Sequence, residues 1–270
     1  KAEPETPLEQ AQQVVYDALR AQGKQREKLA RKALTISPDC ADAYVLLAEA
    51  SKDIAKARSF YEQGVQAGER ALGEELFREG VGEFWGILET RPYMRARLGL
   101  AEILWEMDER QEAIAHAKDL LRLNPDDNQG VRYILANWLL AVGDDDALTP
   151  LLAQYPDDGS AQWAYTTALH TFRQSGAGRK ADKALSAALG ANPFVPLYLL
   201  AIKPPPDRMP EYYGIGDESE AIVYVFESVE GWVETEGALD WLANTMMQIS
   251  LTGPSRKSGR PRSPKRPRQT

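Results

Sequence analysis

The residue types that usually carry catalysis are few in this chain of 270 residues, and they form no catalytic pattern. The two histidines, His116 and His170, lie 54 residues apart, and no cysteine or second histidine accompanies either at metal-site spacing. The single cysteine, Cys40, has no partner for an internal disulfide and is expected to be a small packed residue. The sequence therefore predicts no catalytic residue, no metal site and no cofactor, and hence a protein that is not an enzyme.

Glycine-rich and acidic motifs also lack the context that phosphate or calcium binding requires. The motif "GIGDES" at 214–219 lacks the third glycine of a dinucleotide-binding loop, and "GAGRK" at 176–180 follows no expected strand. The acidic run 144–146 lies in an expected turn between helices and does not have EF-hand spacing. We interpret all three motifs as turns, the last of which also caps a helix.

The segment "FWGILETRPYMRAR" (84–97) is the strongest candidate for binding chemistry. Its three arginines, Arg91, Arg95 and Arg97, crowd the expected start of a helix, where the positive end of the helix dipole disfavours cations. Such a cluster requires compensation from acidic side chains, either within the chain or on a ligand. Two interpretations follow.

In the structural interpretation, Glu89 and Glu102 compensate the arginines in a salt-bridge cluster that holds the segment in place. In the functional interpretation, the arginines form a rim that grips a carboxylate, a phosphate group or an acidic peptide with bidentate geometry. Trp85 and Tyr93 would then supply the aromatic anchors that are typical of binding hot spots.

The C-terminal residues 251–270 carry seven lysines and arginines and no acidic residue, although the whole chain has a net charge of −8. An acidic body repels nucleic acid, so any nucleic-acid binding would depend on this segment. The segment is expected to be disordered, and it could instead be a solubilising tail or fold back on the acidic body. The residues that carry the nucleic-acid alternative are Arg260, Arg262, Lys265, Arg266 and Arg268.

A repeating interval predicts the elements that position these residues. Pro125 and Pro193 lie 68 residues apart, or twice 34, and each closes a similar phrase; a third copy ends at Pro38. A 34-residue period is typical of the helix pairs of tetratricopeptide proteins. Because the expected turns are short, neighbouring helices must be antiparallel. The predicted fold is an all-α, tetratricopeptide-type solenoid, a right-handed superhelix of antiparallel helix pairs with C-terminal capping helices.

Departures from the period predict the domain organisation. The interval from Pro38 to Pro125 exceeds two periods by 19 residues, which indicates an insertion in the solenoid. The predicted segments are a solenoid over 1–203 with an insertion at about 68–92, a proline-rich linker over 204–214, a helical hairpin cap over 215–250, and the disordered basic tail over 251–270.

Local signals predict where helices begin and where they cross. Thr6 followed by Pro7 predicts a helix start, and Asp217 with Glu220 three residues later predicts a capping box. Paired helices approach closely where the crossing residues are small. The residues expected at such crossings are Ala48, Ala57, Ala101, Ala113 and Ala181.

A solenoid is a binding surface, and the first helix of each tetratricopeptide unit lines its concave face. This placement predicts contact residues from three successive units, namely Arg95, Glu102, Arg132, Trp163, Thr166 and His170. The predicted function is a noncatalytic scaffold or adaptor that binds a protein or peptide through the concave face and the Phe84–Arg97 region. The alternative is nucleic-acid association through the basic tail.

Several segments resemble a bacterial family of tetratricopeptide proteins that is similar to the eukaryotic suppressor-of-tumorigenicity-seven proteins. The resemblance covers about 10–245, and its motifs are "NPFVPLYLL" at 192–200, "GDESEAI" at 216–222 and "EGAL" at 236–239. It implies an all-helical fold and no assigned reaction. The eukaryotic members resemble membrane proteins with spans before the repeats; this chain has no such apolar run and no signal peptide, so we expect a cytoplasmic protein. The partner and the oligomeric state stay open.

Overall fold

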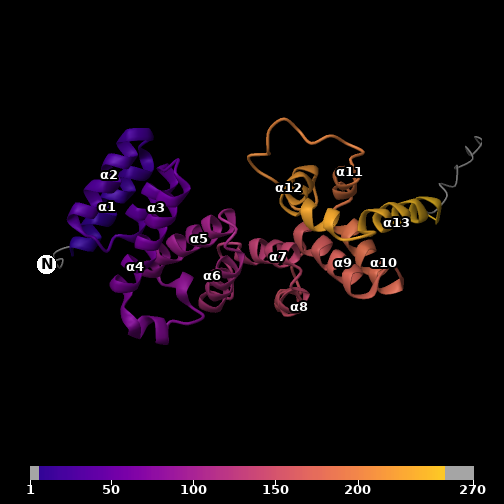
Figure 1. Ribbon diagram of the computed structural model, residues 1–270, viewed down its shortest axis with the longest axis horizontal. Helices are drawn as coiled ribbons and strands as arrows, with labels where there is room; N and C mark the ends of the chain where they lie inside the picture. Colours follow the sequence, from indigo (N-terminus) through magenta and orange to yellow (C-terminus); the bar gives the residue numbers. More distant parts are fainter. Residues whose placement is uncertain (1–5, 253–270) are drawn as a thin grey trace, which may run out of the picture. The chain divides into compact units, whose positions relative to one another are not determined.

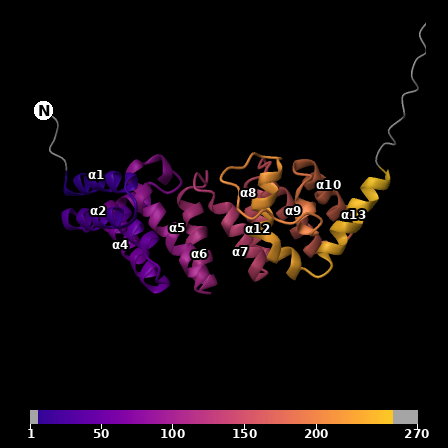
Figure 2. The same cartoon turned by 90° about the horizontal axis from the view of Figure 1, so that it is seen from above.

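The computed structural model describes residues 6–252, and all regular secondary structure in that range is helical. Contacts divide the chain into two compact units, Lys1–Asp158 and Gly159–Thr270, and each is described by itself. Figure 1 shows the helices coloured along the sequence, and Figure 2 shows them from above. Within each unit, most consecutive helices pack against each other, which confirms the prediction of an all-α chain of antiparallel helix pairs.

The first unit has eight α-helices and two short 3₁₀ turns in its described part. Each of these α-helices contacts the next along the chain, and α3 also contacts both α1 and α5. Neighbour-to-neighbour packing of this kind is the organisation of an α-solenoid. The bounds are α1 (Pro7–Arg20), α2 (Gly23–Ile36), α3 (Ala41–Ala50), α4 (Ile54–Glu79), η1 (Phe84–Gly86), η2 (Leu88–Thr90), α5 (Arg91–Glu106), α6 (Arg110–Leu123), α7 (Val131–Val142) and α8 (Asp145–Gln154).

The predicted start of α1 is confirmed in detail. The Thr6 hydroxyl accepts a hydrogen bond from the Glu9 amide at 3.2 Å, and the Glu9 carboxylate accepts one from the Thr6 amide at 2.6 Å. This reciprocal pair is a capping box, and Pro7 occupies the first turn, where its missing N–H has no consequence.

Small residues at the helix crossings allow close approach, as the sequence predicted. All five alanines named for this role are buried. The tightest approach is at Gly99 of α5, where an added Cβ would lie 2.2 Å from the ring of Tyr61 on α4. The Tyr61 ring therefore packs directly on the backbone of α5, and a larger side chain at Gly99 would require the ring to move.

The residues beyond the regular period lengthen α4 and form the two turns. Within α4, Gly73 has a positive φ of 72° and kinks the helix, which then continues to Glu79. The turns that follow are anchored by Phe84, whose ring centroid lies 5.2 Å from that of Phe77 and 6.3 Å from that of Tyr93. This aromatic cluster holds the extra segment against the start of α5.

The second unit contains α9 (Ala161–Ser175), α10 (Arg179–Ala191), α11 (Val195–Leu199), α12 (Glu218–Glu234) and α13 (Ala238–Thr252). α9 packs on both α10 and α12, and α11 packs on α12 and α13. Aromatic side chains form its centre: Tyr165 lies 5.6 Å from Tyr224, and Phe172 stacks on Trp241 at 4.6 Å, measured between ring centroids. The sequence grouped α9 and α10 with the preceding repeats, whereas here they share a core with the later helices.

The capping box expected at the start of α12 is half present. Asp217 accepts a hydrogen bond from the Glu220 amide at 3.0 Å, as predicted. The Glu220 carboxylate does not return to Asp217, whose amide donates to the Gly214 carbonyl. Instead, buried Glu220 accepts hydrogen bonds from Ala161 N, Asn192 Nδ2 and Gly216 N, at 2.9, 2.9 and 2.7 Å. One carboxylate thus joins the starts of α9 and α12 to the end of α10.

Candidate functional site

The arginines near the start of α5 have well-defined surroundings, beginning with Arg95. Its Nε and one terminal nitrogen donate to the two oxygens of Asp42 on α3, at 2.8 and 2.7 Å. Asp42 is buried and also accepts a hydrogen bond from Gln12 of α1 at 2.9 Å. Arg95, Asp42 and Gln12 thus join α5, α3 and α1, and the role of Arg95 seen here is structural.

Arg97 lies in a second internal network on α5 and α6. Its guanidinium donates to the Asp119 carboxylate and the Tyr93 hydroxyl, and Nε donates to Nδ1 of His116 at 3.1 Å. Burial, together with the charge of Arg97, lowers the pKa of His116 below its ordinary value. The neutral ring can therefore accept this hydrogen bond, and His116 is part of the internal network of Arg97.

The expectation that Glu89 and Glu102 compensate these arginines is wrong. Both glutamates are exposed, and the ion-pair partners of Arg95 and Arg97 are Asp42 and Asp119. These partners come from α3 and α6, the helices that flank α5, because the guanidinium groups reach across the helix crossings. Glu89 and Glu102 remain on the surface of the first unit.

Arg91 differs from its two neighbours. Its Nε donates to the carbonyl oxygen of Trp85 at 3.0 Å, and its guanidinium carbon lies 5.0 Å from the centroid of the Trp85 ring. Within the part of the chain that the structure describes, Arg91 forms no ion pair. Its delocalised charge therefore has an aromatic neighbour but no carboxylate in the described part of the chain, which is a cation–π pair without an ion pair.

The turn that presents Trp85 and Arg91 is held by internal hydrogen bonds and carries an exposed apolar side chain. The buried Thr90 hydroxyl lies within hydrogen-bond distance of the Phe84 and Ile87 carbonyl oxygens, which fixes η1 against η2. Leu88, between them in sequence, is 65% exposed. Trp85, Leu88 and Arg91 are named here the turn platform, and together they offer an apolar surface beside one cation.

Tyr93, the other predicted aromatic anchor, is buried between Phe77 and Phe84, but its edge borders a hollow of about 650 Å³ in the first unit. The lining carries both signs of charge, and its arginines are engaged: Arg70 pairs with Asp39 at 2.8 Å, and Arg97 is paired as described. Both arginines are thus already paired with carboxylates outside the lining, and Glu69 and Glu74 add negative charge, so the hollow does not favour an anionic ligand. It is lined by Gln66, Glu69, Arg70, Glu74, Phe77, Tyr93 and Arg97.

Arg132 also lies in an internal network, at the start of α7. It contacts Asp127 at 3.0 Å and Asp158 at 2.9 Å, and its guanidinium carbon lies 4.3 and 5.0 Å from the ring centroids of Tyr133 and Tyr155. Asp127 further accepts hydrogen bonds from the Val131 and Arg132 amides and so caps α7. The predicted contact residue Arg132 is therefore enclosed by its own chain rather than presented on an open face.

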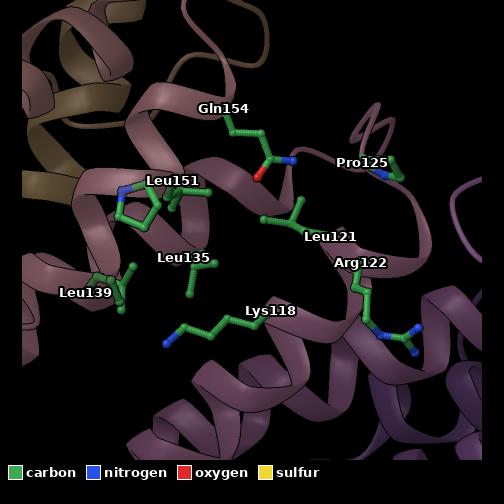
Figure 3. A pocket seen from close by; sticks show the side chains of 10 residues that line it. Lys118, Leu121, Arg122, Pro125, Leu135, Leu139, Leu151 and Gln154 are labelled. Carbon is green, nitrogen blue, oxygen red and sulfur yellow. The ribbon is translucent and has the colours of Figure 1, made fainter.

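A second hollow, of about 500 Å³, lies among α6, α7 and α8 (Figure 3). Lys118 and Arg122 lie on one side of it and Gln154 on the opposite side, with leucines between them. Lys118 is 3.9 Å from Asp144, and Arg122 pairs with Asp119. The wall leucines are nearly buried, so they expose little apolar surface to a partner; they are Leu121, Leu135, Leu139 and Leu151.

The remaining predicted contact residues belong to the second unit. Trp163, Thr166 and His170 were expected on an open face of their helix, but all three are buried. The reason is that α12 packs on α9, as the hydrogen bond from Ser228 to Gln162 at 3.3 Å illustrates. A partner would not reach these three side chains in this arrangement.

Sequence reasoning did not find the carboxylates that neutralise the arginines or the leucines of the second hollow. Asp42 lies 53 residues before Arg95, and no local pattern connects two residues at that separation. Arginines that lack a carboxylate three or four positions away were the only available signal. That signal does not separate Arg91 from Arg95, because the difference is whether a neighbouring helix supplies a carboxylate.

Within residues 6–252, no group of three or more His, Cys, Asp or Glu side chains is placed to hold a metal ion. None of the helices in this range combines the length and the apolar character that a membrane crossing requires. The basic residues of the nucleic-acid alternative, Arg260, Arg262, Lys265, Arg266 and Arg268, lie outside the described residues, and that alternative stays a prediction.

Comparison with solved structures finds a similarity to YrrB, described as a TPR protein with an unusual peptide-binding site. The match has a TM-score of 0.49 and 18% sequence identity, and it covers 73% of this chain and 91% of YrrB.

Comparison with sequences finds suppressor-of-tumorigenicity-seven relatives. The human suppressor of tumorigenicity 7 protein-like is 30% identical over 246 residues, which cover 82% of this chain and 42% of that protein. The ST7 homolog of Caenorhabditis elegans is 27% identical over 259 residues, covering 82% of this chain and 48% of that protein. The chain thus spans less than half the length of these relatives. The sequence model of the ST7 protein family matches residues 4–257, nearly the whole chain. The chain therefore belongs to the ST7 protein family.

Proposed function

We propose that this chain is a noncatalytic scaffold that binds a peptide segment of another protein, and that the turn platform is its contact site. The observation that carries the proposal is the state of Arg91. Of the four arginines that the sequence singled out within the described residues, the other three are ion-paired there. Arg91 alone among them stacks on an aromatic ring without a carboxylate.

The chemistry of the turn platform favours one class of peptide. A guanidinium offers planar donors that match a carboxylate, and Trp85 with exposed Leu88 offers apolar surface beside it. Tryptophan and arginine are also the residues most enriched in binding hot spots. The preferred peptide therefore has an aspartate or glutamate next to a large apolar side chain. Because the Thr90 hydrogen bonds and the packing of Phe84 fix the conformation of the turn, little ordering should be needed on binding.

The test is selection of a displayed random-peptide library on the full chain, followed by titration of the enriched peptides. We expect enriched peptides to pair an acidic residue with leucine, phenylalanine or methionine. Arg91→Gln and Leu88→Ser should each weaken binding at least about tenfold, the effect of losing about 1.4 kcal/mol. Circular dichroism should be unchanged because Leu88 is exposed and Arg91 keeps no structural ion pair.

Arg110→Gln is the matched control. Arg110 also begins a helix and stacks on a tryptophan, with its guanidinium carbon 4.9 Å from the Trp105 centroid, but it is ion-paired with Asp108. It should bind the selected peptides as the wild type does. Equal binding by wild type and Arg91→Gln, or a library that yields no shared pattern, refutes the turn platform as the site.

A further inference from the structure

The second unit carries an apolar helix face that no described residue covers. In α12, the side chains of Phe226, Val229 and Val233 are 71%, 37% and 63% exposed. At about 100° per residue, these positions fall within an arc of about 60° on the helix surface. Ile222, one turn earlier, falls in the same arc and is half-buried. The four residues, named here the α12 stripe, extend over about three turns.

The opposite side of α12 already forms the core of the second unit. Tyr224 and Trp232 are buried, and the Trp232 indole donates a hydrogen bond to the Tyr224 hydroxyl at 2.7 Å. Ser228, on the same side, bonds to Gln162 of α9. The helix is therefore apolar on two sides, and packing within the unit uses only one. Single exposed apolar residues are common on protein surfaces, but a contiguous stripe along one helix marks an interaction site.

Charge decides which partner fits the α12 stripe. α12 contains five glutamates and no lysine or arginine. Three of them, Glu227, Glu230 and Glu234, are exposed and lie on one flank of the stripe, within about 100° of Phe226. A second copy of α12 would bring like charges together, which destabilises pairing, and an anionic membrane surface would be repelled in the same way. A basic amphipathic partner would gain from apolar contact with the stripe and from attraction to the glutamate flank.

We propose that the α12 stripe is the docking site for a basic amphipathic helix of another protein. The partner would place apolar side chains at i, i+3 or i+4, and i+7 on the stripe, with lysine or arginine facing the glutamate flank. This goes beyond the scaffold function of the turn platform, because it uses a different unit and the opposite charge preference. The chain's own residues 253–270 are basic but contain no apolar residue other than proline, so they lack the side chains that would fill the stripe.

The test selects a displayed library of 18-residue amphipathic helices against the full chain. The apolar positions are fixed, and each flanking position is either lysine or glutamate. We expect enrichment of lysine-flanked helices, with affinity that falls as salt concentration rises. The paired variants Phe226→Ser with Val233→Ser, and Glu230→Lys with Glu234→Lys, should each weaken binding at least about tenfold. All four side chains are exposed, so circular dichroism should be unchanged.

Leu19→Ser is the control, because Leu19 is a similarly exposed apolar residue on a helix of the other unit. It should leave binding unchanged, as should Arg91→Gln, which separates this site from the turn platform. Enrichment of glutamate-flanked helices, no enrichment at all, or binding that survives the serine pair overturns the proposal. So does a doubling of the mass in sedimentation that the serine pair abolishes, because a second copy would then occupy the stripe.

Discussion

Removing the Arg132 side chain should destabilise α7 because it takes away a cation that pairs with two buried carboxylates. Asp127 and Asp158 have side chains only 1% and 6% exposed, and Arg132 contacts both. Replacing Arg132 with methionine keeps most of the side-chain volume but removes the cation that contacts both carboxylates. Breaking a buried ion pair in this way costs about 3–5 kcal/mol.

The structure places the expected loss at the low end of that range. Asp127 retains hydrogen bonds from the Val131 and Arg132 amides, at 2.7 and 3.0 Å, and Asp158 retains the Tyr133 hydroxyl at 2.8 Å. We therefore expect a loss of about 3 kcal/mol, which corresponds to roughly 100-fold faster amide exchange in residues 127–142. Hydrogen exchange followed by mass spectrometry measures this locally and does not require two-state unfolding of the whole chain.

The effect of pH distinguishes stranded charge from lost packing. Burial raises the pKa of Asp127, while the amide hydrogen bonds and Arg132 lower it. Loss of Arg132 raises the folded-state pKa further above the unfolded value. The deficit of Arg132→Met is then full at pH 7 and shrinks as the pH falls through that raised pKa and protonation removes the charge. Adding Asp158→Asn should restore part of the protection at pH 7 for the same reason.

Arg110→Met is the control for this experiment. The pair of Arg110 with Asp108 is solvent-exposed, and such pairs contribute less than about 1 kcal/mol. Exchange around Arg110 should change by less than about fivefold. An Arg132→Met deficit that is the same at pH 7 and pH 4.5, and that Asp158→Asn does not reduce, refutes the charge argument.

Three further predictions concern packing and reactivity. Gly99→Ala should lower the free energy of unfolding by about 1–3 kcal/mol in urea titration, because its Cβ meets the Tyr61 ring; Gly190→Ala, where a Cβ meets nothing within 4 Å, should cause no loss. Burial raises the pKa of Cys40 to about 11, so iodoacetamide at pH 8 should modify the folded chain at least about tenfold more slowly than the unfolded chain; equal rates by mass spectrometry would contradict this. Tyr165→Phe should cost about 1–3 kcal/mol, because the buried hydroxyl donates to a backbone carbonyl at the end of α10; an unchanged urea midpoint would contradict this.

The sequence predicted those features that depend on local or periodic signals. The Thr6 cap and the small residues at the crossings are of this kind, because helix geometry alone determines where they must lie. The ion-pair partners of the arginines, in contrast, depend on tertiary packing. Asp42 and Asp119 reach α5 only after three helices have packed, so their distance along the chain carries no information.

The sequence has the same limit for α12. The apolar positions of this helix are visible in the sequence, including Phe226 and Val233. However, both Phe226 and Trp232 are large and apolar, and only the fold determines that Trp232 faces Tyr165 of α9 while Phe226 faces outward. The predicted contact residue His170 was misplaced for the complementary reason, since its burial depends on a helix that begins 48 residues later.

The position of Glu220 also has a consequence for folding during synthesis. Helices of the first unit find their partners among immediate neighbours, so each pair can form soon after it leaves the ribosome. The amide of Ala161, in contrast, bonds to a carboxylate 59 residues later in the chain. At roughly 5–20 residues per second, that carboxylate emerges about 3–12 s after the start of α9. During this interval the start of α9 and the end of α10 lack their hydrogen bonds to Glu220. A chaperone would therefore have most access to the nascent second unit in this period.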